Sequence, residues 1–375
     1  MLGASEVRAI LEWLVAVFSG IHFGIPLTYF AYLRSVARKP WGIEFDTSYK
    51  PLITVILPTC NESEIIEERL DNLRQQEYPR DLLEVVVVDS SNDGTADVVE
   101  KWSESNRNLD LKVLREKARR GKLHALEVAV EHVSEDCEVV VFTDADALWQ
   151  HDALSRAVNY LADPQVGAIT ASIRYTGSKD EFLENTYRNY YNAIRVGESK
   201  IHSTPVHNGP FLAIKWNFLQ DAGLPTFVGS DDSAFGSFVA FMGYRALQVD
   251  DIVVEEPIRG NQVLRRIRRA QHLLLNFRMT RRFTKKRELY RKSSFDRIWK
   301  LEWILHLVNP WFLLIGALLL FSDVVLFKSL VSLALVLIGF AFLGLKAFRM
   351  WIFQQFYLIA AAARNLWTKE TVWRR

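Results

Sequence analysis

Apolar runs at the two ends of the chain constrain its fold more than any other feature does. The first run, residues 10–33, reads ILEWLVAVFSGIHFGIPLTYFAYL and is long enough to cross a hydrocarbon core of ~30 Å as a helix. Arg34, Arg38 and Lys39 follow this run, which argues against a cleaved signal peptide and for an N-terminus outside the cell. Residues 1–40 are therefore predicted to form a transmembrane helix.

Two more apolar runs, 303–321 and 324–345, are separated only by Ser322 and Asp323. Each run is long enough for one crossing, and the short connection would place the two helices side by side. Residues 301–346 are thus predicted to form a transmembrane hairpin that turns at Ser322 and Asp323.

A shorter apolar run, 350–363, contains Gln354 and Gln355 and precedes several basic residues. Because positive charge gathers on the cytosolic side of membrane proteins, we expect residues 347–375 to form an interfacial helix and a tail on that side. A fourth crossing is the alternative.

Residues 264–300 contain fourteen Lys and Arg but only two acidic residues, Glu288 and Asp296. Leucine and phenylalanine recur among these charges at helical spacing, a pattern typical of helices on an anionic bilayer surface. A basic stretch can also bind nucleic acid, but this one directly adjoins an apolar run. We therefore expect residues 259–300 to form basic amphipathic interface helices that contact membrane lipid, with no nucleic-acid partner.

Residues 41–258 alternate two patterns. Unbroken apolar stretches typical of strands alternate with amphipathic stretches typical of helices. Strands are expected at 53–58, 85–88, 110–115 and 139–143, and helices at 64–76, from 95 onward and at 121–133. This order predicts an α/β fold with a mostly parallel, Rossmann-like sheet covered by helices on both faces.

The two cysteines, Cys60 and Cys137, do not lie in a spacing that holds zinc. Two thiols cannot form a disulfide framework either, which favours a reducing compartment. Together with the membrane runs, they predict an integral protein of the cell membrane whose α/β domain lies in the cytosol.

Polar and charged side chains follow the expected strands. They are Thr59, Asn61 and Glu62 after the first strand, Asp89, Ser90 and Asp93 after the second, Lys122 after the third, and Asp144 and Asp146 after the fourth. Parallel strands share one carboxyl edge, where the ligands of α/β sheets bind. The set predicts a crevice for a ligand that carries phosphates and hydrogen-bonding edges.

Asp144 and Asp146 follow a buried strand in the sequence VVFTDADALW. Two carboxylates this close repel each other unless a cation lies between them. A hard divalent ion such as Mn²⁺ or Mg²⁺, itself bound to phosphate oxygens, would satisfy both. An exposed pair that caps a helix is the alternative.

Four short pieces follow one another in the order typical of one enzyme family. They are TVILPTCNE at 54–62, VVVVDSSNDGT at 85–95, RRGKLHAL at 119–126 and DADA at 144–147. With the flanking apolar runs they resemble the family 2 glycosyltransferases with the GT-A fold, and specifically the membrane-embedded polysaccharide synthases of the hyaluronan, chitin and cellulose type. The resemblance covers roughly residues 51–282.

The resemblance implies a nucleotide-sugar site. The donor, expected to be a UDP-sugar, would be bound by Pro58, Thr59, Asn61, Glu62, Asp89, Lys122 and Asp144. Asp89 would meet the uracil ring, and Asp144 and Asp146 would hold Mn²⁺ or Mg²⁺.

Two later pieces resemble the acceptor side of these synthases. HNGPFLAIKW at 207–216 is similar to their Ser-Gly-Pro stretch, with Asn208 in place of the serine. This similarity implies an acceptor site at His207, Asn208, Gly209 and Pro210, with a purely structural role for His207 as the alternative. GSDD at 229–232 is similar to the motif of the catalytic base, which falls on Asp232. Asp231 would then bind the acceptor or raise the pKa of Asp232 through like-charge repulsion.

The stretch LRRIRRA at 264–270 stands where the family usually has Gln-x-x-Arg-Trp. Arg265 replaces the glutamine, Arg268 keeps the arginine and Arg269 replaces the tryptophan. Guanidinium groups match phosphate oxygens in pairs, so Arg265 and Arg268 are expected to clamp a diphosphate, with lipid-facing charge as the alternative. The missing tryptophan, which helps processive synthases to bind the acceptor sugar, argues against long polymers.

These expectations combine in a metal-dependent, inverting glycosyltransferase that extends a glycan at the membrane. The metal ion would act as a Lewis acid on the leaving diphosphate, and Asp232 would take up the proton of the acceptor hydroxyl during direct displacement. One alternative is transfer of a single sugar to a polyprenyl or dolichyl phosphate or to a lipid-linked oligosaccharide. Another, of a different class, is a catalytically silent membrane scaffold that binds nucleotide sugar, although the retained acidic pairs count against it.

Overall fold

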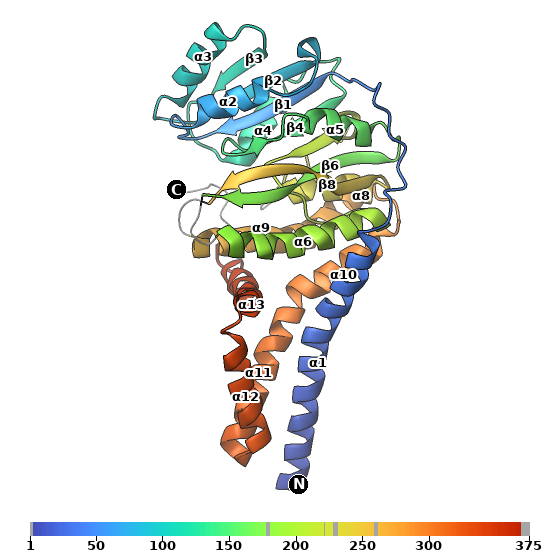
Figure 1. The fold of residues 1–375 in the computed structure, drawn as a ribbon, viewed down its shortest axis with the longest axis vertical. Helices are drawn as coiled ribbons and strands as arrows, with labels where there is room; N and C mark the ends of the chain where they lie inside the picture. The colour runs from blue at the N-terminus through green and yellow to red at the C-terminus, as the bar shows by residue number, and fades with distance from the viewer. Residues whose placement is uncertain (1–2, 178–180, 221, 228–231, 259–261, 369–375) are drawn as a thin grey trace.

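The computed structural model describes residues 3–177, 181–220, 222–227, 232–258 and 262–368. An α/β domain stands on a stalk of long helices, and the N-terminal end of the chain lies at the far end of this stalk (Figure 1). Helices α6 (Glu181–Ile201) and α9 (Gln262–Lys286) lie between the sheet and the stalk. We call these two helices the junction layer.

One eight-stranded sheet forms the centre of the domain, with the strand order β3-β2-β1-β4-β7-β6-β8-β5. The strands are β1 (Ile53–Thr59), β2 (Leu83–Asp89), β3 (Asp110–Arg115), β4 (Val139–Phe142), β5 (Leu148–Trp149), β6 (Val166–Thr176), β7 (Leu212–Lys215) and β8 (Arg245–Pro257). The four strands predicted from the sequence are present as β1 to β4, and their ends lie within two residues of the predicted ones.

Strands β3, β2, β1 and β4 pair in parallel, as predicted. Successive residues of a strand face opposite sides, so Val55 and Leu57 of β1 enter one hydrophobic core and Ile56 enters the other. The first core is covered by α2 (Ile66–Arg74), α3 (Thr95–Ser105) and α5 (Ala153–Leu161), and the second by α4 (Lys122–Val130), α7 (Asn217–Gln220) and α8 (Asp232–Phe241). This half of the sheet is therefore buried on both faces.

The other half of the sheet is mixed. Strand β7 runs antiparallel to β4 and β6, and β5 runs antiparallel to β8, whereas β6 and β8 are parallel. Four of the seven pairings are parallel, so the sheet is mostly parallel. The direction of β7 and β5 was not predicted, because the apolar run of a buried strand does not encode its direction.

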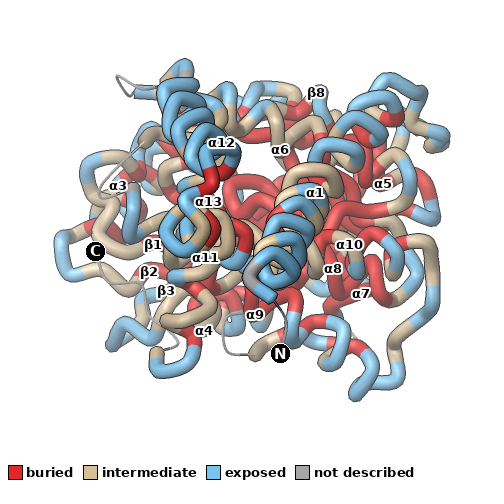
Figure 2. Tube along the Cα trace, turned by 90° about the horizontal axis from the view of Figure 1, so that it is seen from below, coloured by how far each residue is buried: buried red, intermediate tan, exposed pale blue. Residues whose placement is uncertain are grey.

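The stalk contains two stretches, Ser5–Val36 and Phe295–Phe327, that are long and apolar enough to cross a membrane. The first is formed by α1 (Ala4–Val36), which contains the predicted run 10–33. The second combines α10 (Phe295–Leu307) and α11 (Asn309–Phe327), and α1 packs along α11. Seen from the stalk end, α1 and α12 (Leu330–Phe342) expose much of their surface in front of a buried domain core (Figure 2).

The hairpin turns later than predicted. Helix α11 continues through Ser322 and Asp323, and the turn lies at Lys328 and Ser329. Asp323 is fully buried, and its Oδ2 accepts a hydrogen bond of 2.5 Å from the Ser332 hydroxyl. Lys328, in contrast, has a left-handed backbone conformation (φ 50°) that ends the helix. Of the pair that suggested a turn, Ser322 donates to the Leu318 carbonyl oxygen within α11, and Asp323 joins α11 to α12.

Helix α13 (Lys346–Arg364) meets α12 at a bend of 104°. It packs against α9, where Leu358 and Ala361 share a small hydrophobic cluster with Ala270 and Leu274. Helices α12 and α13 are together long and apolar enough for one membrane span, but that span would be broken at the bend. The interfacial positions of α9 and α13 therefore stay predictions.

The domain end of α1 is fixed to α6. Leu33 is fully buried, and a Cβ on Gly197 of α6 would lie 2.6 Å from the Leu33 carbonyl oxygen, so glycine is required there. Lys200 Nζ donates to the carbonyl oxygens of Ala37 and Lys39 at 2.6 Å each. A lysine at this position satisfies carbonyl groups that the end of the helix leaves free, so α1 and the junction layer form one packed unit.

Candidate active site

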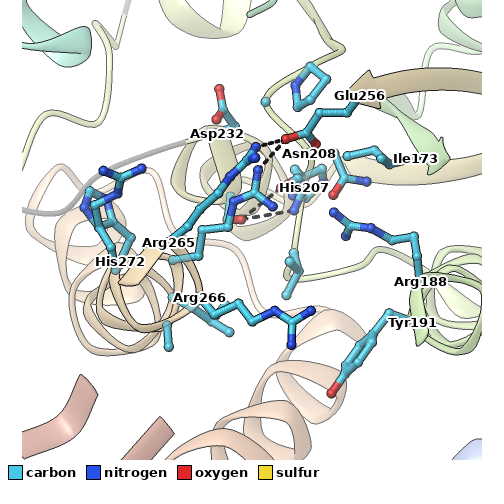
Figure 3. Close-up of a pocket in the computed structure, with 18 of the residues that line it drawn as sticks. Ile173, Arg188, Tyr191, His207, Asn208, Asp232, Glu256, Arg265, Arg266 and His272 are labelled. Carbon is cyan, nitrogen blue, oxygen red and sulfur yellow. Dashed lines mark hydrogen bonds and ion pairs between the residues drawn. The ribbon is translucent and has the colours of Figure 1, made fainter. Parts of the chain in front are cut away.

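A cavity of about 240 Å³ connects the turn after β4 with the junction layer. Lys122, Asp144 and Asp232 line one part of it, and arginines of α6 and α9 line another. Figure 3 shows Arg188 and Tyr191 on one helix facing Arg265 and Arg266 on another across this space. The carboxyl edge of the sheet is thus open toward the stalk.

The turns after β1 and β2 are held together by a network of hydroxyl groups. Asp89 is almost fully buried, and its Oδ1 accepts hydrogen bonds from Thr59 Oγ1 at 2.6 Å and Ser91 Oγ at 2.5 Å. Asn61 has a positive φ of 58°, and its backbone N–H donates to Ser91 Oγ at 2.7 Å. The Glu62 amide donates to Thr95 Oγ1 at 3.0 Å. These bonds fix the carboxylate of Asp89 before any ligand arrives.

The structure brings the predicted donor residues Pro58, Thr59, Asn61, Glu62 and Asp89 to neighbouring strand ends, as expected for a parallel pair. They lie outside the lining of the cavity, whereas Lys122 and Asp144 belong to that lining. The predicted donor residues therefore form two groups, one at the ends of β1 and β2 and one at the cavity.

Lys122 lies between two carboxylates. Its Nζ is 2.8 Å from Asp144 Oδ1 and 3.4 Å from Asp232 Oδ2. Gly121, with φ 100°, makes the turn that starts α4 at this lysine. Although its burial opposes the charge, Asp144 and Asp232 raise the pKa of Lys122 above its ordinary value. A permanent cation therefore occupies the centre of the site.

The two carboxylates beside Lys122 differ in proton affinity. Burial favours the neutral form of Asp144, but Lys122, Arg269 and Arg265 outweigh it and hold the pKa of Asp144 below its ordinary value. For Asp232, burial and the nearby Asp144 outweigh Lys122, and its pKa is raised. Asp144 is thus suited to stay ionised, and Asp232 has the higher proton affinity that a general base requires.

Asp144 and Asp146 supply the oxygen atoms that Mn²⁺ and Mg²⁺ prefer. Both residues are half-buried in the turn between β4 and β5. Within the described ranges, no three His, Cys, Asp or Glu side chains gather closely enough to hold an ion by themselves. The pair fits a divalent ion that completes its coordination with the oxygens of a bound diphosphate.

The predicted acceptor turn lies directly against Asp232. A Cβ on Gly209 would be 2.3 Å from Asp232 Oδ2 and 3.1 Å from Lys122 Nζ, so only glycine fits there. The Asn208 amide is already bonded, because Oδ1 accepts from Arg195 at 2.9 Å and Nδ2 donates to the carbonyl oxygen of Ala171 at 2.8 Å. Asn208 therefore holds Arg195 in place at the wall of the cavity.

His207 is buried at the cavity wall with neither ring nitrogen bonded to a described residue. Its ring packs on Gly236 of α8, where a Cβ would come within 2.4 Å of it. Burial and the nearby Arg195 lower the pKa of His207 to about 3. The imidazole is consequently neutral over the physiological pH range. The predicted partner Asp231 lies outside the described residues.

Arg265 of the predicted arginine clamp is ion-paired. Arg265 and Arg269 both contact the buried Glu256, with Arg269 Nη2 2.6 Å from Glu256 Oε1. Arg266 pairs with Glu184 of α6, and Arg268 lines the cavity. The charged lining of this part consists of Arg188, Arg195, Arg265, Arg266, Arg268, Arg269, Glu184 and Glu256. Six positive charges against two negative ones make it attractive to an anion.

Sequence reasoning missed the contribution of α6 to this site. Glu184, Arg188, Tyr191 and Arg195 recur every three or four residues and thus share one face of the helix. Their periodicity within 181–201 is the signal that could have revealed a polar, ligand-facing helix. Glu256 had no such signal, because it ends a long strand outside any motif.

The chain is similar to known proteins along most of its length. The family model described as "Glycosyl transferase family 2" matches residues 54–219, and the model described as "Glycosyl transferase family group 2" matches residues 139–352, more than half of the chain. The structure resembles that of the mannosyltransferase PcManGT from Pyrobaculum calidifontis, solved in complex with GDP-Man and Mn²⁺, with a TM-score of 0.84 and 43% sequence identity. That match covers 96% of this chain and 100% of the other.

Two relatives are more distant. The poly-beta-1,6-N-acetyl-D-glucosamine synthase of Staphylococcus aureus (strain COL) is 27% identical over 307 residues, covering 77% of this chain and 71% of the relative. The glycosyltransferase AglE of Haloferax volcanii is 28% identical over 178 residues, covering 47% of this chain and 57% of the relative. With the family match, the GT-A sheet and the acidic turn after β4, these findings identify the chain as a member of the family 2 glycosyltransferases.

Proposed function

We propose that the chain is a membrane-bound, inverting glycosyltransferase that moves a single sugar from a nucleotide sugar to an acceptor at the cytosolic membrane surface. The observation that carries this proposal is the group Lys122, Asp144 and Asp232. It combines a cation, an ionised carboxylate and a carboxylate with raised pKa at the edge of the sheet where ligands bind. A silent scaffold would not need a carboxylate held in this way.

Each residue of this group has a role in transfer. Asp144 and Asp146 would hold Mn²⁺ or Mg²⁺, which when bound neutralises charge on the leaving diphosphate. Lys122 adds a second positive charge beside the same phosphates. Asp232 accepts the proton of the acceptor hydroxyl while that oxygen attacks the anomeric carbon, and the sugar is transferred in one displacement with inversion.

The donor is best sought first among guanosine diphosphate sugars. Similarity at 43% identity over nearly the whole chain to a mannosyltransferase solved with GDP-Man supports GDP-mannose. The UDP-sugar expected from the polysaccharide synthases is the second candidate, supported by the more distant similarity to a synthase of poly-N-acetylglucosamine. Asp89 would suit the base in either case, since both bases carry N–H groups that can donate to a carboxylate.

The cavity favours a lipid-linked acceptor over a growing polymer. It reaches from Asp232 to His306 of α10 and Leu358 of α13, close to the stalk. Its arginine excess matches a phosphate group, and an acceptor that carries its sugar on a membrane-anchored phosphate would present both groups together. Such a substrate also suits a chain that lacks the acceptor-binding tryptophan of processive synthases.

Transfer assays on the purified protein in detergent test this function. Radiolabelled GDP-mannose and UDP-N-acetylglucosamine are supplied in turn with an extract of polar lipids, with Mn²⁺ or with EDTA. We expect one glycolipid product that disappears in EDTA and returns with Mn²⁺. A ladder of chain lengths would support the polymer alternative instead. Absence of both transfer and donor hydrolysis with every nucleotide sugar would contradict the proposal.

A variant pair makes this assay specific. Asp144→Asn removes one charge of the acidic turn and should lower turnover by ~10²- to 10³-fold, as loss of a charge-stabilising group does. The matched control is Asp97→Asn, because Asp97 is an exposed aspartate on α3 that pairs only with Arg115. Equal loss in both variants would show that the assay reports stability rather than chemistry.

A further inference from the structure

Arg69 of α2 is a fully buried arginine that the mechanism above does not use. Its Nη1 donates to Asn72 Oδ1 at 2.6 Å and its Nη2 donates to Thr143 Oγ1 at 2.9 Å. Its guanidinium carbon lies 4.2 Å from the centre of the Trp149 ring. A buried charge is costly unless its surroundings compensate it, so its position near the acidic turn requires an explanation.

The partners of Arg69 stand at the two ends of the turn that carries Asp144 and Asp146. Thr143 precedes this turn and Trp149 follows it. Asn72, one helical turn after Arg69, accepts from the Trp149 amide and donates to the Trp149 carbonyl oxygen, both at 2.9 Å. Arg69 and Asn72 therefore grip both ends of the acidic turn from α2.

Thr143 and Trp149, the residues held by Arg69 and Asn72, also bond to the predicted acceptor turn. Thr143 Oγ1 donates to the Pro210 carbonyl oxygen at 2.9 Å, and Trp149 Nε1 donates to that oxygen at 2.8 Å. Pro210 adjoins Gly209, which lies against Asp232. A continuous chain of buried hydrogen bonds thus runs from Arg69 to the backbone beside Asp232.

Electrostatics support this placement. Burial lowers the pKa of Arg69 to about 9, while Asp144 and Asp146 act in the opposite direction. The positive charge therefore offsets repulsion within the acidic pair from the protein side.

We propose that Arg69 is a positioning residue that holds the acidic turn and the Pro210 turn in one fixed register, so that sugar transfer depends on it more than nucleotide binding does. The proposal rests on the proposed function, because it concerns the alignment of donor and acceptor. Misalignment by a fraction of an ångström in such a site lowers turnover without removing a binding contact.

Arg69→Lys is the main test, because lysine keeps the charge but lacks the planar fork that binds Asn72 and Thr143 together. We expect transfer turnover to fall ~10- to 100-fold, the usual effect of losing a supporting group. The affinity for Mn²⁺ and GDP, measured by electron paramagnetic resonance of the free ion, should fall much less than turnover, because no residue that binds either one is removed. The matched control is Arg74→Lys on the same helix, since Arg74 pairs near the surface with Asp71.

Trp149→Phe provides a second test if Arg69→Lys does not fold. It keeps an aromatic ring beside Arg69 and removes only the Nε1 bond to Pro210. We again expect lower turnover with unchanged binding of Mn²⁺ and GDP. The double variant Arg69→Lys/Thr143→Val should lose less turnover than the sum of the two single effects, because both residues belong to the same chain of hydrogen bonds.

Three results would overturn the proposal. They are wild-type turnover in both Arg69→Lys and Trp149→Phe, a loss of Mn²⁺ and GDP binding equal to the loss of turnover, and additive effects of Arg69→Lys and Thr143→Val. A wild-type protein that binds Mn²⁺ and nucleotide but neither transfers nor hydrolyses any sugar would instead overturn the proposed function.

Discussion

The two halves of the sheet build their parts of the site in different ways. In the parallel half, Thr59, Asp89 and Ser91 follow strands β1 and β2 and are fixed by short hydrogen bonds to one another. In the mixed half, the charged groups come from helices and a strand that are far apart in the sequence, as Arg195 of α6 and Glu256 of β8 are. We call the group Thr59, Asp89 and Ser91 the prepared surface. The part of the cavity lined by the six arginines, Glu184 and Glu256 is called the chamber.

The two halves also differ in how their charged groups are satisfied when no ligand is bound. The hydroxyl groups of Thr59 and Ser91 donate to the carboxylate of Asp89 and satisfy it without a ligand. The chamber instead carries six arginines against two glutamates, and Arg265 and Arg269 share the single carboxylate of Glu256. Unbalanced buried charge is costly until a counter-ion arrives. We therefore expect ligand binding to stabilise the chamber more than the β1–β2 turns.

Asp232→Asn should separate the two halves most strongly. Removing the base should lower turnover by ~10²- to 10⁴-fold while nucleotide binding by the parallel half continues. Turnover at saturating donor and the dissociation constant of the nucleotide are measured together. The control is Asp250→Asn, an exposed aspartate of β8 in the same half. A nucleotide affinity that fell as far as the turnover would show that the halves are not independent.

Gly209→Ala should have the next largest effect. The added methyl group would lie 2.3 Å from Asp232 Oδ2 and must displace that carboxylate. Displacement of a reacting group by about 1 Å typically costs ~10²-fold in rate. Gly24→Ala is the matched control, because a methyl group there meets nothing within 4 Å. Unchanged turnover in Gly209→Ala would remove Asp232 from the chemistry.

Asp89→Asn tests the parallel half alone. A hydrogen bond to a charged group contributes about 1.5–3 kcal/mol, so the nucleotide should bind ~10- to 100-fold more weakly. Turnover at saturating donor should change little, since Asp89 lies outside the cavity. Calorimetric titration with GDP and UDP measures the affinity. An equal loss of turnover would mean that the prepared surface also aligns the sugar.

The smallest effect concerns pH and the mixed half. His207 has a pKa of about 3 when folded, against about 6.5 when unfolded. Its contribution to stability is fully present above pH 6.5 and is lost as the pH falls toward 3, because only the unfolded chain takes up the proton. Between pH 7 and pH 5 this amounts to about 2 kcal/mol.

Melting temperatures at the two pH values check this effect. The drop from pH 7 to pH 5 should be smaller in His207→Gln than in the wild type, whereas substitution of the exposed His151 should leave it unchanged. An identical drop in His207→Gln would assign the acid sensitivity to other groups.

The predictability of the site follows the same division. Asp89 and Asp144 could be proposed from the sequence because each stands at the end of an apolar strand, and Lys122 because it belongs to the Gly-Lys turn after the third strand. The chamber could not, since Arg195 meets Asn208 and Arg266 meets Glu184 only after the chain has folded. Arg265 was expected to bind a diphosphate, yet its nearest carboxylate, Glu256, lies on a strand that no motif marks.

The stalk shows the same limit. Ser322 and Asp323 look like a turn because polar residues interrupt an apolar run. In the folded chain, Asp323 bonds to Ser332 across the hairpin, and the helix continues to Phe327. A pattern of polarity records where water is excluded or admitted, but it does not show which buried polar residues will bond to each other across a hairpin.

The clamp between α1 and α6 has a consequence for the reach of the enzyme. A helix of 33 residues is about 50 Å long at 1.5 Å per residue, well beyond the ~30 Å of a hydrocarbon core. Because Gly197 and Lys200 hold the domain end of α1 tightly, the active site would stay at a fixed distance from the lipid headgroups. The enzyme would then select acceptors by the distance between their membrane anchor and their terminal sugar.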